Sequence, residues 1–215
     1  MSTAHIEVIM WPAAYQALNR LPFGLQRFWL KFATGFIGTA HKLQVRGFQD
    51  HSQCPRCGEQ GENNSHVLRC PQADPLWRSH QLSLKTELRR LNTAPELADA
   101  ILCNLEAWRS GADPVFPTTN RWGECDAALA QHTLGWTNFV YGRWHTQWAA
   151  AQGNYLQAQA SKLSPRRWTS ALIKKLYMTA WDFWDHRNKV LHAPGGPRAQ
   201  AEAAQLDLAV VEEYS

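Results

Sequence analysis

Three cysteines and one histidine constrain this chain more than any other feature. The segment CPRCGEQGENNSHVLRC supplies Cys54, Cys57, His66 and Cys70 in the spacing C-x2-C-x8-H-x3-C. A C-x2-C turn lets two thiolates reach one ion, and an H-x3-C step places two further donors one helical turn apart. Pro55 and Gly58 suit a tight turn between them, because proline presets its φ and glycine tolerates a positive φ. The pattern predicts a structural Zn²⁺ site in a small knuckle over residues 51–72; the alternative is ordinary reduced cysteines and a surface histidine.

A set of four protein ligands also predicts what the metal does. Four-coordinate zinc with no open position cannot bind a water or a substrate, so it stabilises a fold and performs no chemistry. We therefore expect no catalytic residues in the knuckle.

Composition narrows the class of protein. The 215 residues are 45% hydrophobic and include 11 tryptophans, so the chain can bury a core and is not generally disordered. The net charge of +4 is compatible with a nucleic-acid partner without requiring one. Cys103 and Cys125 lack the spacing of a disulfide framework and are expected to be reduced and buried. With no signal peptide and no long apolar run, an intracellular protein, nuclear or cytoplasmic and without a membrane partner, is expected.

Apolar periodicity predicts a mostly α fold with the zinc knuckle inserted between helices. Stripes at helical spacing cover residues 25–36, 76–91 and 128–159, and a final pair of helices is expected over 164–192. Pro95 and the pair Ser164–Pro165 are typical helix starts. A boundary loop at 110–123, rich in Pro and Gly, divides a helical region 1–110 that carries the knuckle from a Trp-rich helical region 124–192. A helical tail follows over 193–215.

The knuckle and its flanks resemble the zinc-binding segment that follows the polymerase in non-LTR retrotransposon reverse transcriptases. The matching residues, in order, are Trp29, Leu43, Arg46, Cys54, Pro55, Cys57, Gly58, His66, Leu68, Cys70 and Pro71. GWTNFVYGRW and WDFWDHRNKVLH are similar to the Trp-rich helical region that accompanies this segment. The resemblance implies a non-catalytic accessory domain that helps a polymerase engage RNA or target DNA. The chain itself has no YxDD polymerase motif and no recognisable RNase H or endonuclease residues.

Basic residues around the knuckle are candidate nucleic-acid contacts. Arg46, Arg56 and Arg69 are predicted to bind phosphates, as the basic groups of small knuckles do. The alternative is that these groups, together with Glu59 and Glu62, form a solvated charged face.

The aromatic run Trp136–Trp148 allows two interpretations. Its 3–4-residue spacing is typical of a helix face buried in a core, and a base-stacking platform is the less favoured interpretation. A second overall function follows from the tryptophans: a protein-interaction module that docks to a polymerase, with zinc purely structural.

WDFWDHRNKVLH allows a third function. Arg187 and His192, with Asn188, are similar to the R-N-x4-H box of HEPN ribonucleases, in which Arg stabilises phosphate charge and His acts as an acid–base group. The alternative is a structural role in which Arg187 pairs with Asp182 or Asp185. The structural role is favoured, and the chain is not expected to be an enzyme.

Overall fold

The fold is built of helices around one long central helix. The computed structural model describes residues 6–213, and side chains through residue 207. Its helices are α2 (Trp11–Asn19), α3 (Phe23–Ala33), α4 (Ala40–Val45), α5 (Asn64–Arg69), the 3-10 turn η1 (Pro71–Ala73), α6 (Asp74–Arg90), α7 (Pro95–Ser110), α8 (Glu124–Leu134), α9 (Trp136–Val140), α10 (Thr146–Ala158), α11 (Pro165–Leu191) and α12 (Pro197–Glu213). Within the described residues, β pairing is limited to an antiparallel bridge between Ile9 and His145. The predicted mostly α class is confirmed.

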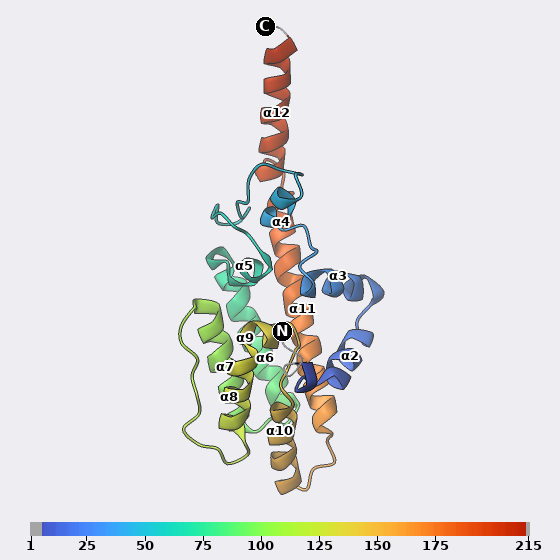
Figure 1. Ribbon diagram of the computed structural model, residues 1–215, viewed down its shortest axis with the longest axis vertical. Helices are drawn as coiled ribbons and strands as arrows, with labels where there is room; N and C mark the ends of the chain where they lie inside the picture. Colours follow the sequence, from blue (N-terminus) through green and yellow to red (C-terminus); the bar gives the residue numbers. More distant parts are fainter. Residues whose placement is uncertain (1–5, 214–215) are drawn as a thin grey trace.

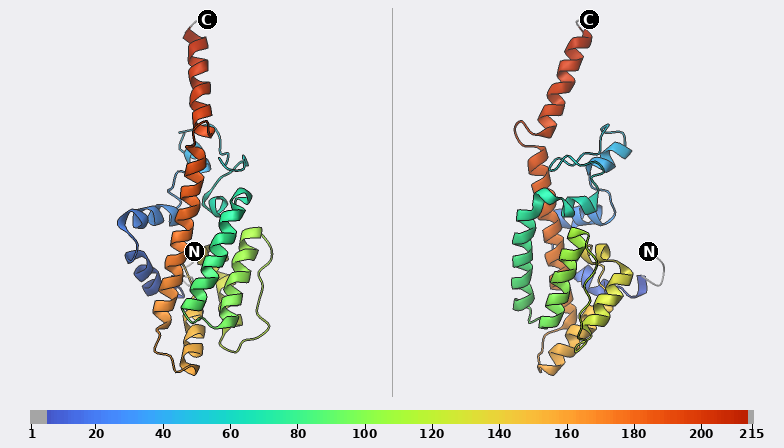
Figure 2. Two further views of the ribbon diagram at one scale, coloured as in Figure 1. Left: turned by 180° about the vertical axis from the view of Figure 1, so that it is seen from behind. Right: turned by 90° about the vertical axis from the view of Figure 1, so that its left-hand side faces the viewer.

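Helix α11 organises the molecule. Ser164 caps it by accepting a hydrogen bond from the Arg167 amide, and Pro165 occupies its first turn. The helix then continues without a break for 27 residues, so the expected pair of helices is a single helix. Helices α2 and α3 lie on one side of α11, and α6 and α7 lie on the other (Figures 1 and 2). Beyond α11, α12 extends away from the body of the protein (Figure 1).

The predicted aromatic run is buried, as its spacing indicated. Phe139 and Trp148 are fully covered, and the Phe139 ring stacks on Trp144 with centroids 4.0 Å apart. The segment 128–159 is not one helix, however, because two glycines with positive φ interrupt it. Gly135 (φ +97°) separates α8 from α9, and Gly142 (φ +72°) follows α9 where a Cβ would lie 2.5 Å from the Tyr177 hydroxyl.

The loop 111–123 contains no helix or strand, as expected. Helices from both sides of it contribute to one continuous apolar core. A buried amide also connects them: the Gln152 side chain accepts from the Ala94 amide at 3.1 Å and donates to the Asn92 carbonyl at 2.8 Å. The two helical regions therefore share their interior in this structure.

The free cysteines outside the knuckle are less buried than expected. Cys103 is exposed and Cys125 is half-buried. Cys103 lies on the face of α7 opposite the one that buries Ile101 and Leu105, which explains the difference. No helix among the described residues is long and apolar enough to cross a membrane.

Candidate metal centre

The four predicted ligands are held by two short pieces of local structure. Asn63 caps α5 by accepting a hydrogen bond from the His66 amide at 2.9 Å, so His66 and Cys70 lie about one turn apart at the helix end. On the other side of the site, the Gly58 amide donates to the Cys54 carbonyl at 2.8 Å and closes the turn that carries Cys57. Gly58 has a φ of +78°, which fits the conformational role expected for it.

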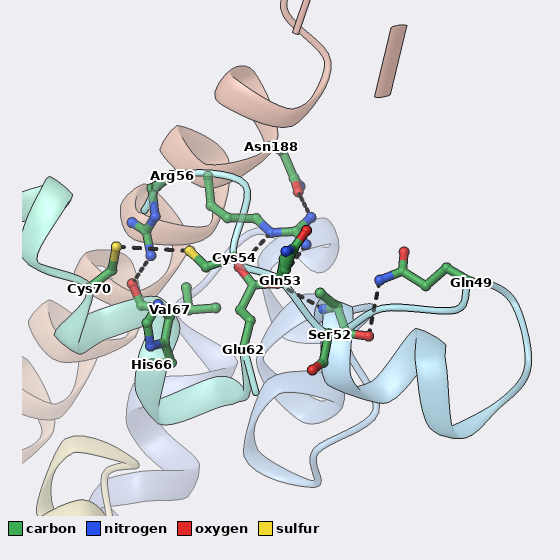
Figure 3. Close-up of polar contacts among 12 residues, drawn as sticks. Gln49, Ser52, Gln53, Cys54, Arg56, Glu62, His66, Val67, Cys70 and Asn188 are labelled. Atoms are coloured by element: carbon green, nitrogen blue, oxygen red, sulfur yellow. Dashed lines mark hydrogen bonds and ion pairs between the residues drawn. The ribbon is translucent and has the colours of Figure 1, made fainter. Parts of the chain in front are cut away.

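The ligand atoms converge on one point, and we call the four residues the Cys3His cluster. All four ligand atoms lie within 4.8 Å of one another. The Cys54 and Cys70 sulfurs are 3.9 Å apart and point toward one another (Figure 3), and Cys57 Sγ lies 3.4 Å from His66 Nε2. Tetrahedral zinc with bonds of about 2.3 Å to sulfur and about 2.1 Å to nitrogen would give separations of about 3.8 and 3.6 Å. The cluster therefore has the donor types and the spacing of a four-coordinate zinc site.

The thiols strongly influence one another's ionisation. Hydrogen bonding from Cys70 lowers the pKa of Cys54 to about 2, whereas the hydrogen bond with Cys54 and burial raise the pKa of Cys70. Burial likewise raises the pKa of Cys57. Three thiols this close cannot all ionise without a compensating cation, and a divalent metal supplies that charge.

His66 is oriented for coordination. Its Nε2 faces the sulfurs, while Nδ1 lies 3.9 Å from a carboxylate oxygen of Glu59. A carboxylate beyond the outer ring nitrogen is a common arrangement at zinc-bound histidines, because it favours the tautomer that leaves the inner nitrogen free to bind.

Arg56 lies beside the sulfurs and is half-buried. One guanidinium nitrogen, Nη2, donates to the Val67 carbonyl (Figure 3). Its Nε and Nη1 atoms are buried and have no hydrogen-bond partner among the described residues. Its positive charge favours the thiolate form of Cys70. Zinc with three thiolates and one neutral imidazole carries a net charge of −1, and Arg56 is placed to offset it.

The other two predicted phosphate contacts have partners of their own. Arg69 donates from Nε to the Arg109 carbonyl at 3.1 Å, and its guanidinium lies over the Trp108 ring. Arg46 is exposed at the end of α4, over the ring of Phe36 at 5.1 Å. The three arginines thus contact three different surroundings, and their phosphate-binding role stays a prediction.

A buried ion pair that no local sequence pattern indicated anchors the metal loop, residues 51–72, to α11. The Glu62 carboxylate accepts from Arg187 Nε at 3.0 Å and from Nη2 at 2.7 Å, and both side chains are at most 3% exposed. The same carboxylate accepts from the Ala40 amide, in the first turn of α4, at 2.8 Å. The alternative interpretation of the basic residues placed Glu62 on a solvated charged face, and the structure places it instead in the interior.

The expected pairing of Arg187 within α11 is wrong. Asp182 lies 3.4 Å from His80, and Asp185 pairs with Lys189 at 2.7 Å. Residues two and five positions from Arg187 point to other faces of the helix, so neither aspartate can share its buried side.

Arg109 is a second buried residue that supports the loop. It donates to the Leu68 and Cys70 carbonyls and pairs with Asp74. These contacts satisfy carbonyl groups at the C-terminal end of α5, next to the fourth ligand. The partners are 35–41 residues apart in the chain, and no local pattern could have indicated them.

Arg187 and His192 lie in different surroundings, one buried and the other exposed. Every guanidinium nitrogen of Arg187 is bonded, with Nη1 donating to Asn188 at 3.1 Å and the other two to Glu62. His192 is exposed at the C-terminal end of α11. In this arrangement the Arg187 side chain faces the interior of the protein, with Glu62 and Asn188 as its partners.

No protein-family model, no curated protein and no solved structure matches this chain.

Proposed function

We propose that the Cys3His cluster binds a structural Zn²⁺ ion that holds the loop 51–72 in place. The convergence of the four ligand atoms within 4.8 Å carries this proposal. Arg56 beside the sulfurs and Glu59 beyond His66 add the surroundings that such a site needs. Because all four positions are filled by the protein, the metal leaves no site for a substrate.

The experiment is to measure bound metal in the purified protein and then to replace it with Co²⁺. One equivalent of zinc and the absorption bands of tetrahedral cobalt–thiolate are expected. A Cys57→Ser variant should lose stoichiometric zinc, and a Cys103→Ser variant, which removes an exposed cysteine outside the cluster, should retain it. Equal zinc content in both variants would contradict the proposal.

We further propose that the protein binds nucleic acid without catalysis, as an accessory module of a retroelement reverse transcriptase. The resemblance of the knuckle to the segment that follows such polymerases supports this function. A second support is the charge of residues 8–49, which include five Lys or Arg residues and no Asp or Glu. Since phosphate contacts release counterions, the affinity for an oligonucleotide should fall steeply as salt is raised. Affinity that is absent at low salt would overturn this function.

A protein-interaction module is the second candidate, and exposed apolar side chains favour it. Phe23 is 72% and Phe48 is 75% exposed. Exposed aromatic side chains of this size are available to contact a partner protein. Tight, salt-insensitive association with a polymerase domain, without oligonucleotide binding, would support this candidate over the first.

A further inference from the structure

A groove separate from the metal centre lies between α3, the loop 34–39 and α11. Its volume is about 380 Å³, which is in the range of small-ligand sites. Aromatic and basic side chains dominate its lining: Arg27, Phe28, Lys31, Phe36, Trp181 and Trp184. We call it the α3–α11 groove. No ligand of the Cys3His cluster contributes to it.

The aromatic side chains form the floor and one rim of the groove. Phe28 is buried and contacts Trp181 edge-on, with ring centroids 5.0 Å apart, while Trp184 lies 6.4 Å from it at an interplanar angle of 30°. Both tryptophans are only half-buried, and Phe36 is 62% exposed. Flat apolar surface thus remains accessible inside a hollow of limited size.

The cations of the groove have no acidic partners. Arg27 and Lys31 are exposed, and no carboxylate of the described residues lies within ion-pair distance of either. Lys42 and Arg46, on α4, lie over the Phe36 ring at 5.8 and 5.1 Å. These residues belong to the acid-free segment 8–49. The groove is therefore both aromatic and positively charged.

We propose that the α3–α11 groove binds single-stranded nucleic acid. One unpaired base lies against Phe36 and Trp184, and the flanking phosphates contact Arg27 and Lys31. This inference rests on the proposed nucleic-acid function and adds the place and the strandedness of the ligand. Aromatic groups combined with a basic groove are the means by which proteins hold unpaired bases, whereas a base inside a duplex cannot enter such a hollow. An acidic peptide would satisfy the cations but would leave the aromatic surface without a partner.

The groove is physically connected to the metal loop. Arg187 lies over the Trp184 ring at 5.1 Å and binds the Glu62 carboxylate, which also holds the Ala40 amide of α4. Helix α4 in turn carries Lys42 and Arg46 to the Phe36 rim. An ordered metal loop therefore fixes one side of the groove.

The test measures the affinity of the full, zinc-loaded chain for short oligothymidylate, oligouridylate and a duplex of the same length, by fluorescence anisotropy. Phe36→Ala should weaken single-strand binding roughly 5- to 150-fold, the range found for loss of one base–aromatic stack. Lys31→Ala should reduce the slope of log affinity against log salt by about 0.7, the value for one phosphate of a single strand. Tyr15→Ala removes an exposed aromatic side chain on α2, and Lys85→Ala removes an exposed cation on α6; both are controls expected to bind like wild type.

Each outcome decides between the proposals. Wild-type binding that is unchanged by Phe36→Ala and Lys31→Ala would overturn the groove and leave the nucleic-acid function standing. Equal affinity for duplex and single strand would also overturn the groove. A wild-type protein that binds no oligonucleotide would overturn both. Because Phe36 and Lys31 are exposed, their variants should keep the wild-type melting midpoint, which separates lost binding from lost folding.

Discussion

Breaking the Glu62–Arg187 pair should be among the most damaging single changes to this protein. Both side chains are nearly inaccessible, and two hydrogen bonds of 3.0 and 2.7 Å join them. Arg187→Met keeps most of the apolar stem of the arginine side chain. It leaves the Glu62 carboxylate buried, with the backbone amide of Ala40 as its remaining hydrogen-bond donor. Removing one member of a buried pair typically costs about 3–5 kcal/mol. For a chain of this size, that cost corresponds to a fall in the melting midpoint of about 6–20 °C.

The assay is chemical and thermal unfolding of Arg187→Met, Glu62→Gln, the double variant that combines them, and one control variant beside wild type. Glu62→Gln should also be destabilising, because it leaves the arginine charge buried. The double variant should be more stable than Arg187→Met alone, since no unpaired charge remains. Lys189→Met, which breaks the exposed pair with Asp185 on the same helix, is the matched control and should leave the midpoint unchanged. A loss below about 1 kcal/mol for Arg187→Met would refute the reasoning, because losses that small are typical of exposed pairs.

Three further predictions concern the metal, the core and acid. A strong chelator or Cys57→Ser should remove amide-exchange protection from residues 51–72, because metal binding in small zinc modules supplies roughly 10–16 kcal/mol of apparent folding energy; unchanged protection would contradict a structural metal. Gly142→Ala should destabilise the protein by at least about 1 kcal/mol in urea unfolding, since its φ is +72° and the new Cβ would meet the Tyr177 hydroxyl; a neutral result would show that Tyr177 moves aside at little cost. Burial lowers the pKa of His80 and of His145, so the folded protein keeps both imidazoles neutral. The free energy of unfolding should therefore decline as pH falls below about 6.5, because the unfolded chain takes up protons there. His145→Asn retains a cap acceptor for the Gln147 amide without titrating and should flatten that decline, and an unchanged pH profile would rule out a contribution from His145.

Local signals in the sequence were sufficient for the metal cluster and most helices. The two ligand pairs are close in sequence, so a turn and one helical turn are enough to define them. Ser164 and Pro165 marked the start of α11 for the same reason. The interruptions at Gly135 and Gly142 were missed because apolar spacing continued across them, although glycine at those points was a visible signal. Glu62 and Arg187 are 125 residues apart, and such a contact is set by tertiary packing alone.

The same contact links the proposed metal site to the proposed binding groove. Glu62 lies inside the loop that the Cys3His cluster closes. Its amide donates to the Ser52 carbonyl of the same loop at 2.9 Å, and its carbonyl accepts from the His41 amide of α4 at 3.1 Å. If the loop opens, α4 loses the backbone and side-chain partners of its first turn, and Arg187 loses its counterion. A six-residue helix has little stability of its own, so α4 should loosen together with the loop. Zinc removal should therefore weaken oligonucleotide binding at the Phe36 rim even though no cluster ligand lines the groove. Affinity that survives chelation, in a protein shown to be metal-free, would mean that the groove and the metal loop are independent.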